Sequence, residues 1–226
     1  GALFYPRGYE SSLKERLRIA RLRYGRRAAV VSACALIAFL GAGSWVYYNT
    51  NVLNEYERHA DKQRALAVYE TRYAHYVGSP APSFQAIDLE VDFYPEAGRL
   101  ESRGNAALRN NKSAPIDSFV MTVSPKLTVN KLTIVGAALD TSDPDEGVYV
   151  YAVDPALEPG ATLELRWDMT RRSRGFENAD EEYKLVRNGS YLGAGDVMPI
   201  PGFDSDRFIS DVSWRKKLGL PPAERL

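Results

Sequence analysis

Residues 87–95 read IDLEVDFYP, in which the apolar side chains of residues 87, 89, 91 and 93 alternate with the carboxylates of residues 88, 90 and 92. Successive side chains of a β-strand point to opposite faces of the sheet. This alternation therefore predicts a strand with one buried and one solvated face. Residues 95–98, Pro-Glu-Ala-Gly, predict a turn that leads into a second, weaker strand over residues 99–109.

The alternating stretch opens a longer β-rich region. Turn residues such as Pro125 and the acidic loop of residues 143–147 separate short apolar segments, and between Phe84 and Thr170 no segment is suited to a crossover helix. Short, regularly spaced strands of this kind predict a mainly β fold, an antiparallel β-sandwich. The further predicted strands are residues 119–123, 127–135, 148–153 and 163–169.

The C-terminal part of the chain has a different composition. Residues 171–206 are rich in Gly, Asn, Asp and Pro, which predicts ordered loops. A short helix is predicted around residues 213–218. Residues 221–226, PPAERL, have the composition of a linker, and we expect the natural chain to continue beyond them.

An uncharged stretch lies N-terminal to the β-rich region, where residues 28–48 read AAVVSACALIAFLGAGSWVYY. A helix of this length spans about 31 Å, close to the thickness of the hydrocarbon core of a bilayer. Aromatic side chains prefer the lipid–water boundary, and basic side chains are common just outside a membrane span. We therefore predict a single transmembrane helix. Its predicted membrane-interface residues are Arg26, Arg27, Trp45, Tyr47 and Tyr48.

The zero net charge of the chain is a cancellation between its two ends. Residues 1–27 carry eight Lys or Arg and two Glu, whereas residues 49–226 carry the remaining 21 basic and 27 acidic side chains. Because Lys and Arg beside a span are retained in the cytoplasm, we expect a cytoplasmic N-terminus and an outer C-terminal part. The basic segment fits an amphipathic helix on an anionic leaflet. Nucleic-acid binding is the rival interpretation, and we expect no nucleic-acid partner.

Two other interpretations of the apolar stretch are open. Residues 41–43 are small enough to precede a signal-peptidase site, but the run is longer than in a usual signal peptide. Residues 31–34 fit a lipoprotein box, but the run continues past Cys34. We expect Cys34 to act as a small apolar residue in lipid. Because it is the single cysteine, an intrachain disulfide and a multi-thiolate zinc site are excluded.

The segment between the span and the β-rich region is rich in Ala, Glu, Arg and Leu. Residues 52–77 predict a helical stalk that extends the anchor away from the bilayer. Residues 78–82, Gly-Ser-Pro-Ala-Pro, end it, because proline cannot continue a helix. The predicted divisions are a basic cytoplasmic segment (1–27), the span (28–48), the stalk and Pro linker (49–83), the β-sandwich (84–215) and a linker (216–226).

The chain offers few groups for catalysis. Its two histidines, His59 and His75, both fall on the predicted stalk, and neither belongs to a His-Glu-x-x-His zinc motif. The acidic residues 140–146 lack the spacing of a calcium loop. A glycine-rich phosphate loop and a nucleophile elbow are also absent from the sequence. We therefore assign no catalytic, cofactor-binding or metal-binding residue and predict that these residues are not an enzyme.

Five segments of the predicted β domain have a familiar pattern: 87–95 (IDLEVDFYP), 100–104 (LESRG), 157–165 (LEPGATLEL), 188–191 (NGSY) and 199–203 (PIPGF). On these segments, residues 84–215 resemble the N-terminal, saddle-shaped β domain of aminopeptidase N-type (M1) zinc metallopeptidases. The basic span followed by YYNTNVLNEY is similar to bacterial proteins that fuse an ABC-transporter permease region to such a peptidase region.

The resemblance does not extend to catalysis. The family holds the substrate amine with a Gly-x-Met-Glu-Asn strand, but residues 175–178, Gly-Phe-Glu-Asn, lack the methionine and the spacing. We expect those residues to form a loop. Any zinc is expected in a downstream domain, because the family's zinc ligands are not in this chain.

The resemblance implies a membrane anchor and non-catalytic β domain of a permease–aminopeptidase fusion, supporting a downstream zinc aminopeptidase-like domain. It also implies a bacterial inner membrane, with the β domain in the periplasm. The expected partners are the lipid bilayer and either other transmembrane helices or the downstream catalytic domain. The alternative is a stand-alone single-span protein whose β-sandwich binds a protein or envelope partner.

Overall fold

The computed structural model of the chain describes Lys14, residues 17–18 and 21–22, residues 24–176, Asn178 and residues 191–222. The predictions for residue 177, for residues 188–190 and for residues 223–226 lie outside the described residues. The chain separates into two compact units, Gly1–Asn54 and Glu55–Leu226, and each is described by itself.

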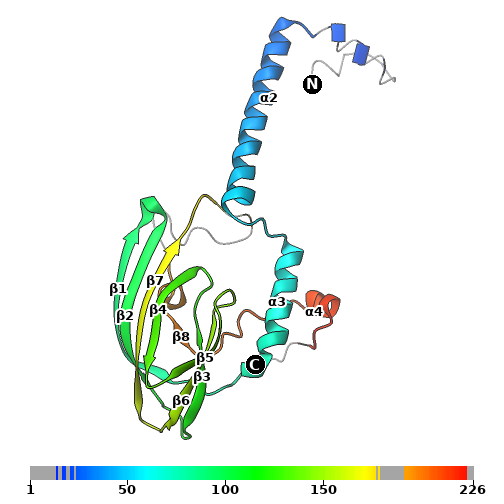
Figure 1. The fold of residues 1–226 in the computed structure, drawn as a ribbon. Helices are drawn as coiled ribbons and strands as arrows, with labels where there is room; N and C mark the ends of the chain where they lie inside the picture. The colour runs from blue at the N-terminus through cyan, green and yellow to red at the C-terminus, as the bar shows by residue number, and fades with distance from the viewer. Residues whose placement is uncertain are drawn as a thin grey trace. The chain divides into compact units, whose positions relative to one another are not determined.

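The first unit is built around one long helix. Helix α2 (Arg26–Tyr47) runs into a π-helical segment, η1 (Tyr48–Leu53) (Figure 1). No α2 side chain is buried. By length and composition, Arg26–Leu53 is the one described helix that could cross a membrane, with a mean hydropathy of 2.0. At its C-terminal end, the side chains of Asn49 and Thr50 donate hydrogen bonds of 2.8 and 3.0 Å to backbone carbonyls one turn earlier.

The second unit contains two four-stranded sheets, which we call sheet A and sheet B, and every strand pair in them is antiparallel. Sheet A has the order β1 (Ser83–Tyr94), β2 (Arg99–Arg109), β7 (Thr162–Arg172), β4 (Leu127–Val135). Sheet B has the order β5 (Ala138–Asp143), β6 (Val148–Leu157), β3 (Ile116–Thr122), β8 (Ile200–Pro201).

The main core lies between the two sheets. It combines side chains of β2, β4 and β7 with side chains of β3 and β6. The largest side chain in it is Trp167 of β7, which is 3% exposed and lies across Gly104 of β2. The indole Nε1 of Trp167 donates a 3.1 Å hydrogen bond to the hydroxyl of Ser102. The Ser102 hydroxyl in turn donates to the carbonyl of Val197. The fully buried core side chains include Leu108, Ile116, Met121, Leu165 and Met169.

The predicted β-sandwich is confirmed, and a strand of the structure corresponds to each of the six predicted strands. Two further strands were not predicted. In β5 most side chains are exposed, so the segment carries no alternation, and it pairs with β6 because a short turn folds it back. In β8 only two residues pair with β3, within a region predicted as loop.

Sheet B is covered on both faces, and its second cover is a helix. Helix α3 (His59–Tyr73), followed by the 3₁₀ turn η2 (Ala74–Tyr76), places Tyr69 and Tyr73 against Val120 of β3 and against β6. Tyr69 is 1% exposed and its hydroxyl donates to the Asp204 carbonyl at 3.1 Å. Burial raises the pKa of Tyr69 to about 12. These contacts explain why β3 and β6 are apolar at consecutive positions rather than at alternating ones.

The prediction of a helical stalk over residues 52–77 is wrong in two respects. The helix is interrupted, since residues 54–58 are not helical. Helix α3 also does not stand clear of the β domain but belongs to the same compact unit, which begins at Glu55 rather than at residue 84. The tyrosines that recur at helical spacing bury against sheet B, which gives the helix a tertiary contact that a free stalk lacks.

A polar contact near the end of α3 fixes its position over sheet B. The Tyr73 hydroxyl donates a 2.5 Å hydrogen bond to the carboxylate of Asp143, and the Arg72 guanidinium donates one of 2.9 Å. The Tyr73 bond is the main cause that lowers the pKa of Asp143 below its ordinary 3.8. Burial raises the pKa of Tyr73, so this hydroxyl stays protonated at neutral pH.

A second short helix joins α3. Helix α4 (Val212–Leu218) begins at Asp211, whose carboxylate accepts hydrogen bonds from two backbone N–H groups, and ends at Gly219 with φ +72°. Arg215 of α4 is buried and donates to both carboxylate oxygens of Glu70 at 2.7 and 3.0 Å. It also donates to the carbonyls of Ile209 and Pro221, at 2.7 Å each. The predicted helix at residues 213–218 is therefore present.

Candidate functional site

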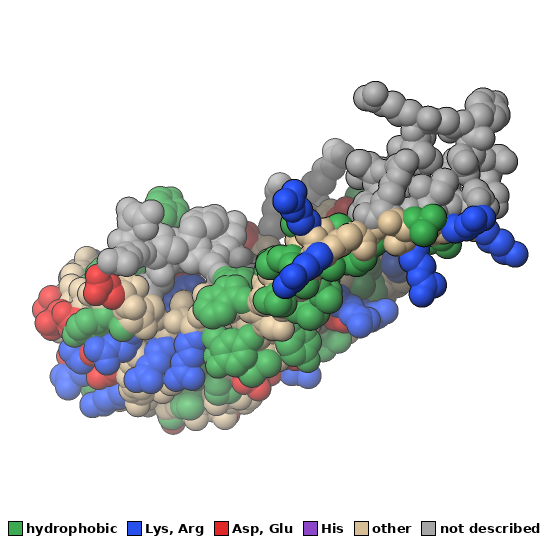
Figure 2. Space-filling view, turned by 90° about the horizontal axis from the view of Figure 1, so that it is seen from above, with side chains coloured by type: hydrophobic (Ala, Val, Ile, Leu, Met, Phe, Trp, Pro, Cys, Tyr) green, Lys and Arg blue, Asp and Glu red, His purple; other side chains and the backbone are tan. Residues whose placement is uncertain are grey.

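The predicted membrane-interface residues lie at the two ends of one helix. Arg26 and Arg27 open α2 and are exposed, while Trp45 and Tyr47 stand in its last turn, 64% and 62% exposed. Tyr48 follows in η1 at 48% exposed. At 1.5 Å per residue, the two ends are about 30 Å apart. Figure 2 looks at this helix from its N-terminal side and shows apolar side chains around it with Lys and Arg side chains nearby. The role of the predicted membrane-interface residues at a bilayer stays a prediction.

Strand β1 carries a row of apolar side chains that we call the β1 stripe. Ile87, Leu89 and Phe93 are 44%, 39% and 47% exposed, and Val91 between them is partly buried. In the register with β2, Ile87 lies opposite Ala106 and Leu89 opposite Gly104. Val91 lies opposite Ser102 and Phe93 opposite Leu100. Cross-strand partners point to the same side of a sheet. The β1 stripe therefore lies on the core side of sheet A, but outside the part that sheet B covers.

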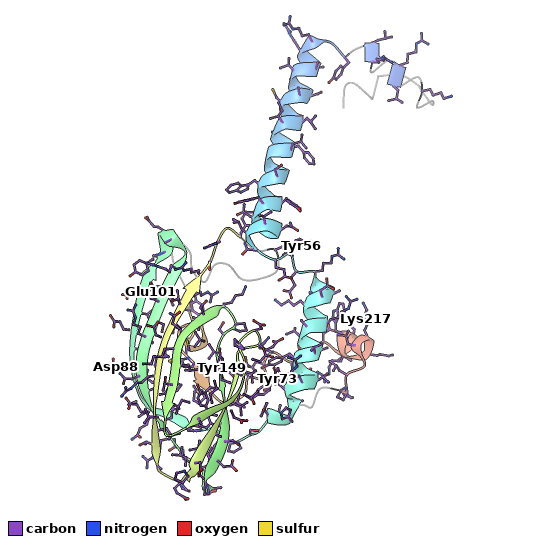
Figure 3. The ribbon with its side chains drawn as sticks, viewed as in Figure 1. Tyr56, Tyr73, Asp88, Glu101, Tyr149 and Lys217 are labelled. Atoms are coloured by element: carbon purple, nitrogen blue, oxygen red, sulfur yellow. The ribbon has the colours of Figure 1, made fainter. Side chains whose placement is uncertain are left out.

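The opposite face of β1 is acidic. Asp88, Glu90 and Asp92 alternate with the β1 stripe, and Figure 3 labels Asp88 at the outer margin of sheet A. Asp92 lies 3.5 Å from a guanidinium nitrogen of Arg103 in β2. Arg103 also pairs with Glu101 at 2.8 Å and with Asp168 at 3.5 Å, and attraction to these carboxylates, Asp168 first, raises its pKa.

The two histidines are not brought together for chemistry. His59 meets the ring of Trp214 edge-on at 5.5 Å, and His75 packs on Tyr76 at 4.0 Å. Among the described residues, no three His, Cys, Asp or Glu side chains are grouped so that they could hold a metal ion.

A cavity of about 540 Å³ opens beside the loop after β3. Its charged lining includes Asp196 and Arg207, and each has a partner: Asp196 pairs with Arg171 at 3.2 Å, and Arg207 pairs with Glu146 at 2.8 Å. The Arg207 guanidinium also stacks 3.9 Å from the centre of the Tyr69 ring. Asp196 and Arg207 are therefore both used in ion pairs, and Arg207 also in packing.

The loop that contains residues 175–178 has a structural role at its described end. The Asn178 side chain donates to the Glu57 carbonyl at 2.7 Å and accepts from the Glu57 N–H at 3.1 Å. This two-bond contact ties the segment that precedes α3 to the segment that follows β7. Sequence reasoning treated Asn178 only as part of a loop, and no local pattern indicates a partner 121 positions away.

Comparisons with known proteins give similarity at the level of structure. No family model matches the chain, and no curated protein sequence matches it. A two-domain M1 zinc metallopeptidase bound to L-tryptophan is similar with 17% identity and a TM-score of 0.32, over 42% of this chain and 21% of that chain. An M1 zinc metallopeptidase from Deinococcus radiodurans is similar with 15% identity and a TM-score of 0.33, over the same shares. The similarity spans about a fifth of the length of those proteins and falls on their N-terminal domain.

Proposed function

We propose that the chain is the membrane anchor and non-catalytic β domain of a larger bacterial protein, a permease–aminopeptidase fusion. In this proposal, residues 1–27 lie in the cytoplasm, α2 crosses the inner membrane, and the β-sandwich supports a downstream zinc aminopeptidase-like domain in the periplasm. The observation that carries the proposal is α2, an apolar helix with no buried side chain, joined in one chain to a folded β domain.

Two further observations support this proposal. Apart from Arg26 and Arg27 at its start, helix α2 is uncharged. Exposing its apolar side chains to water is unfavourable, so a lipid environment gives them a suitable solvent. The asymmetry of basic residues around the span supports the orientation.

The size of the native polypeptide tests the fusion. An antibody raised against residues 84–215 is expected to detect, on a denaturing gel of the source cell's membrane fraction, a band far above the 25.2 kDa of this chain. The band is expected to resist alkaline extraction, because a spanning helix is not released with peripheral proteins. A membrane-bound band at 25.2 kDa would contradict the fusion and leave the stand-alone anchored binding protein.

A further inference from the structure

Strand β1 has an open edge of unusual length. It contains 12 residues, against about five or six in a typical strand, and it pairs along one side with β2 from Ser83 to Tyr94. No other described strand pairs with it. Open edges are normally protected by shortness, by charged side chains (above all Lys), by Pro, by inward-pointing charges or by bulges. The charged side chains of β1 are three carboxylates on its outer face. β1 has no Lys or Pro, its core-side residues are apolar, and its one irregularity lies at its start, between Phe84 and Ala86.

The two faces of β1 define the chemistry that the open edge accepts. On the core side, the β1 stripe leaves apolar area that a neighbouring strand would cover. On the outer side, Asp88 and Glu90 are exposed and form no ion pair with any residue that the structure describes. Asp92 has to share Arg103 with two other carboxylates. In the register, Glu90 lies opposite Arg103 without forming an ion pair with it. The edge therefore presents more carboxylates than basic partners, beside exposed apolar area.

A second copy of this chain is a poor match for this edge. If two β1 strands paired antiparallel about Glu90, the acidic outer faces would be opposite each other. Like charges directly opposite in a sheet are destabilising. A strand with basic residues on its outer face and apolar residues on its inner face would instead gain cross-strand ion pairs and cover the β1 stripe.

We propose that the open edge of β1 binds an extended segment of a partner protein, in which basic and apolar residues alternate, and that this segment adds to sheet A as a fifth strand. Backbone hydrogen bonds would supply the pairing, while Asp88 and Glu90 would select the basic residues. The inference goes beyond the proposed function and depends neither on the membrane anchor nor on the downstream domain.

A designed peptide tests the selection by charge. The probe is a peptide of about ten residues in which Lys and Val alternate, matching the length of a long strand. The comparison peptide has Glu in place of Lys. We expect the full chain in detergent micelles to bind the Lys peptide about tenfold more tightly at low salt, measured by fluorescence anisotropy.

A charge-reversed variant distinguishes this site from general attraction to an acidic protein. The double substitution Asp88→Lys and Glu90→Lys is expected to reverse the preference toward the Glu peptide. The matched control, Asp117→Lys with Glu158→Lys, changes two exposed acidic residues away from β1 and is expected to keep the preference for the Lys peptide. An equal effect of the two double variants, or binding of neither peptide, would overturn the proposal.

Backbone methylation tests whether the peptide binds as a strand. In an alternating peptide, the N–H groups of the Lys residues point to one edge and those of the Val residues to the other. N-methylation of all Lys residues therefore blocks hydrogen bonding along one edge of the peptide, and N-methylation of all Val residues blocks it along the other edge. We expect one derivative to lose at least about tenfold in affinity and the other to keep it. Equal binding by both derivatives would refute strand addition. Self-association of the wild-type chain that is lost on β1 charge reversal would also overturn the proposal, in favour of a second copy.

The outcomes separate this inference from the proposed function. Failure of peptide binding leaves the gel and extraction results for the native polypeptide untouched. A native band at 25.2 kDa removes the fusion but leaves the β1 edge to be tested by the same peptides.

Discussion

Replacing Glu70 by alanine is expected to lower the free energy of unfolding of the β unit by about 3–5 kcal/mol. Glu70 and Arg215 are 6% and 5% exposed, so the substitution would leave a buried guanidinium without its carboxylate. The carboxylate also accepts the Ile209 N–H at 3.3 Å, so a second buried group would lose its partner. The effect can be measured by denaturant unfolding of the full chain in detergent micelles, and the amide exchange of α3 should accelerate.

Two variants serve as controls for the buried pair. Substituting both partners, Glu70→Leu with Arg215→Met, is expected to destabilise less than either single loss, because no charge is left unpaired. Asp61→Ala removes a partner of Arg64 from an exposed pair on the same helix and is expected to cost about 0.5 kcal/mol or less. If Glu70→Ala cost no more than Asp61→Ala, the buried pair would not be what holds α4 to α3.

Truncating Trp167 to alanine is expected to destabilise the β-sandwich by about 3–5 kcal/mol. The indole fills the space above Gly104, where even an added Cβ would come within 2.4 Å of its ring, so its removal leaves a cavity. Trp167→Phe keeps most of the packing but leaves Ser102 without the indole donor, and we expect about 1–2 kcal/mol. Unfolding followed by the far-ultraviolet signal of the strands checks the order of the two variants. Equal losses would mean that packing over Gly104 does not carry the effect.

The sequence predicted those strands whose environment matches a simple rule. β7 alternates because one face meets the core and the other meets solvent. β3 and β6 were found from their continuous β-branched and aromatic residues. β5 and β8 escaped because exposed or very short strands bury too little to leave a pattern.

The position of α3 could not be predicted in the same way. Its tyrosines were visible at helical spacing, but the surface that they cover is formed by β3 and β6, far away in the sequence. The buried charges of Glu70 and Arg215 give no local signal either, since they are separated by 145 positions. A strand with apolar residues on both faces indicates that other residues pack on each face. It does not indicate which segment packs on the second face.

The two candidate sites also differ in whether consecutive residues are enough to predict them. The membrane-interface residues are predicted from the sequence alone, because a span is defined by consecutive residues, and their role stays a prediction. The β1 edge cannot be predicted in this way, although the alternation of β1 is plain in the sequence. Alternation predicts a buried face, and the strand order that leaves β1 at the margin of sheet A depends on pairings between distant segments.

Labelling from one side of the membrane tests the central claim, that the chain crosses a bilayer with its β domain outside. Cys34→Ser leaves the chain without a thiol, and a single cysteine is then introduced by Asp145→Cys in an exposed turn or by Lys14→Cys in the basic segment. In intact cells that produce the full chain, a membrane-impermeant maleimide is expected to label the Asp145→Cys variant and to label the Lys14→Cys variant only after lysis. Labelling of the Lys14→Cys variant in intact cells, or protection of the Asp145→Cys variant, would contradict the account.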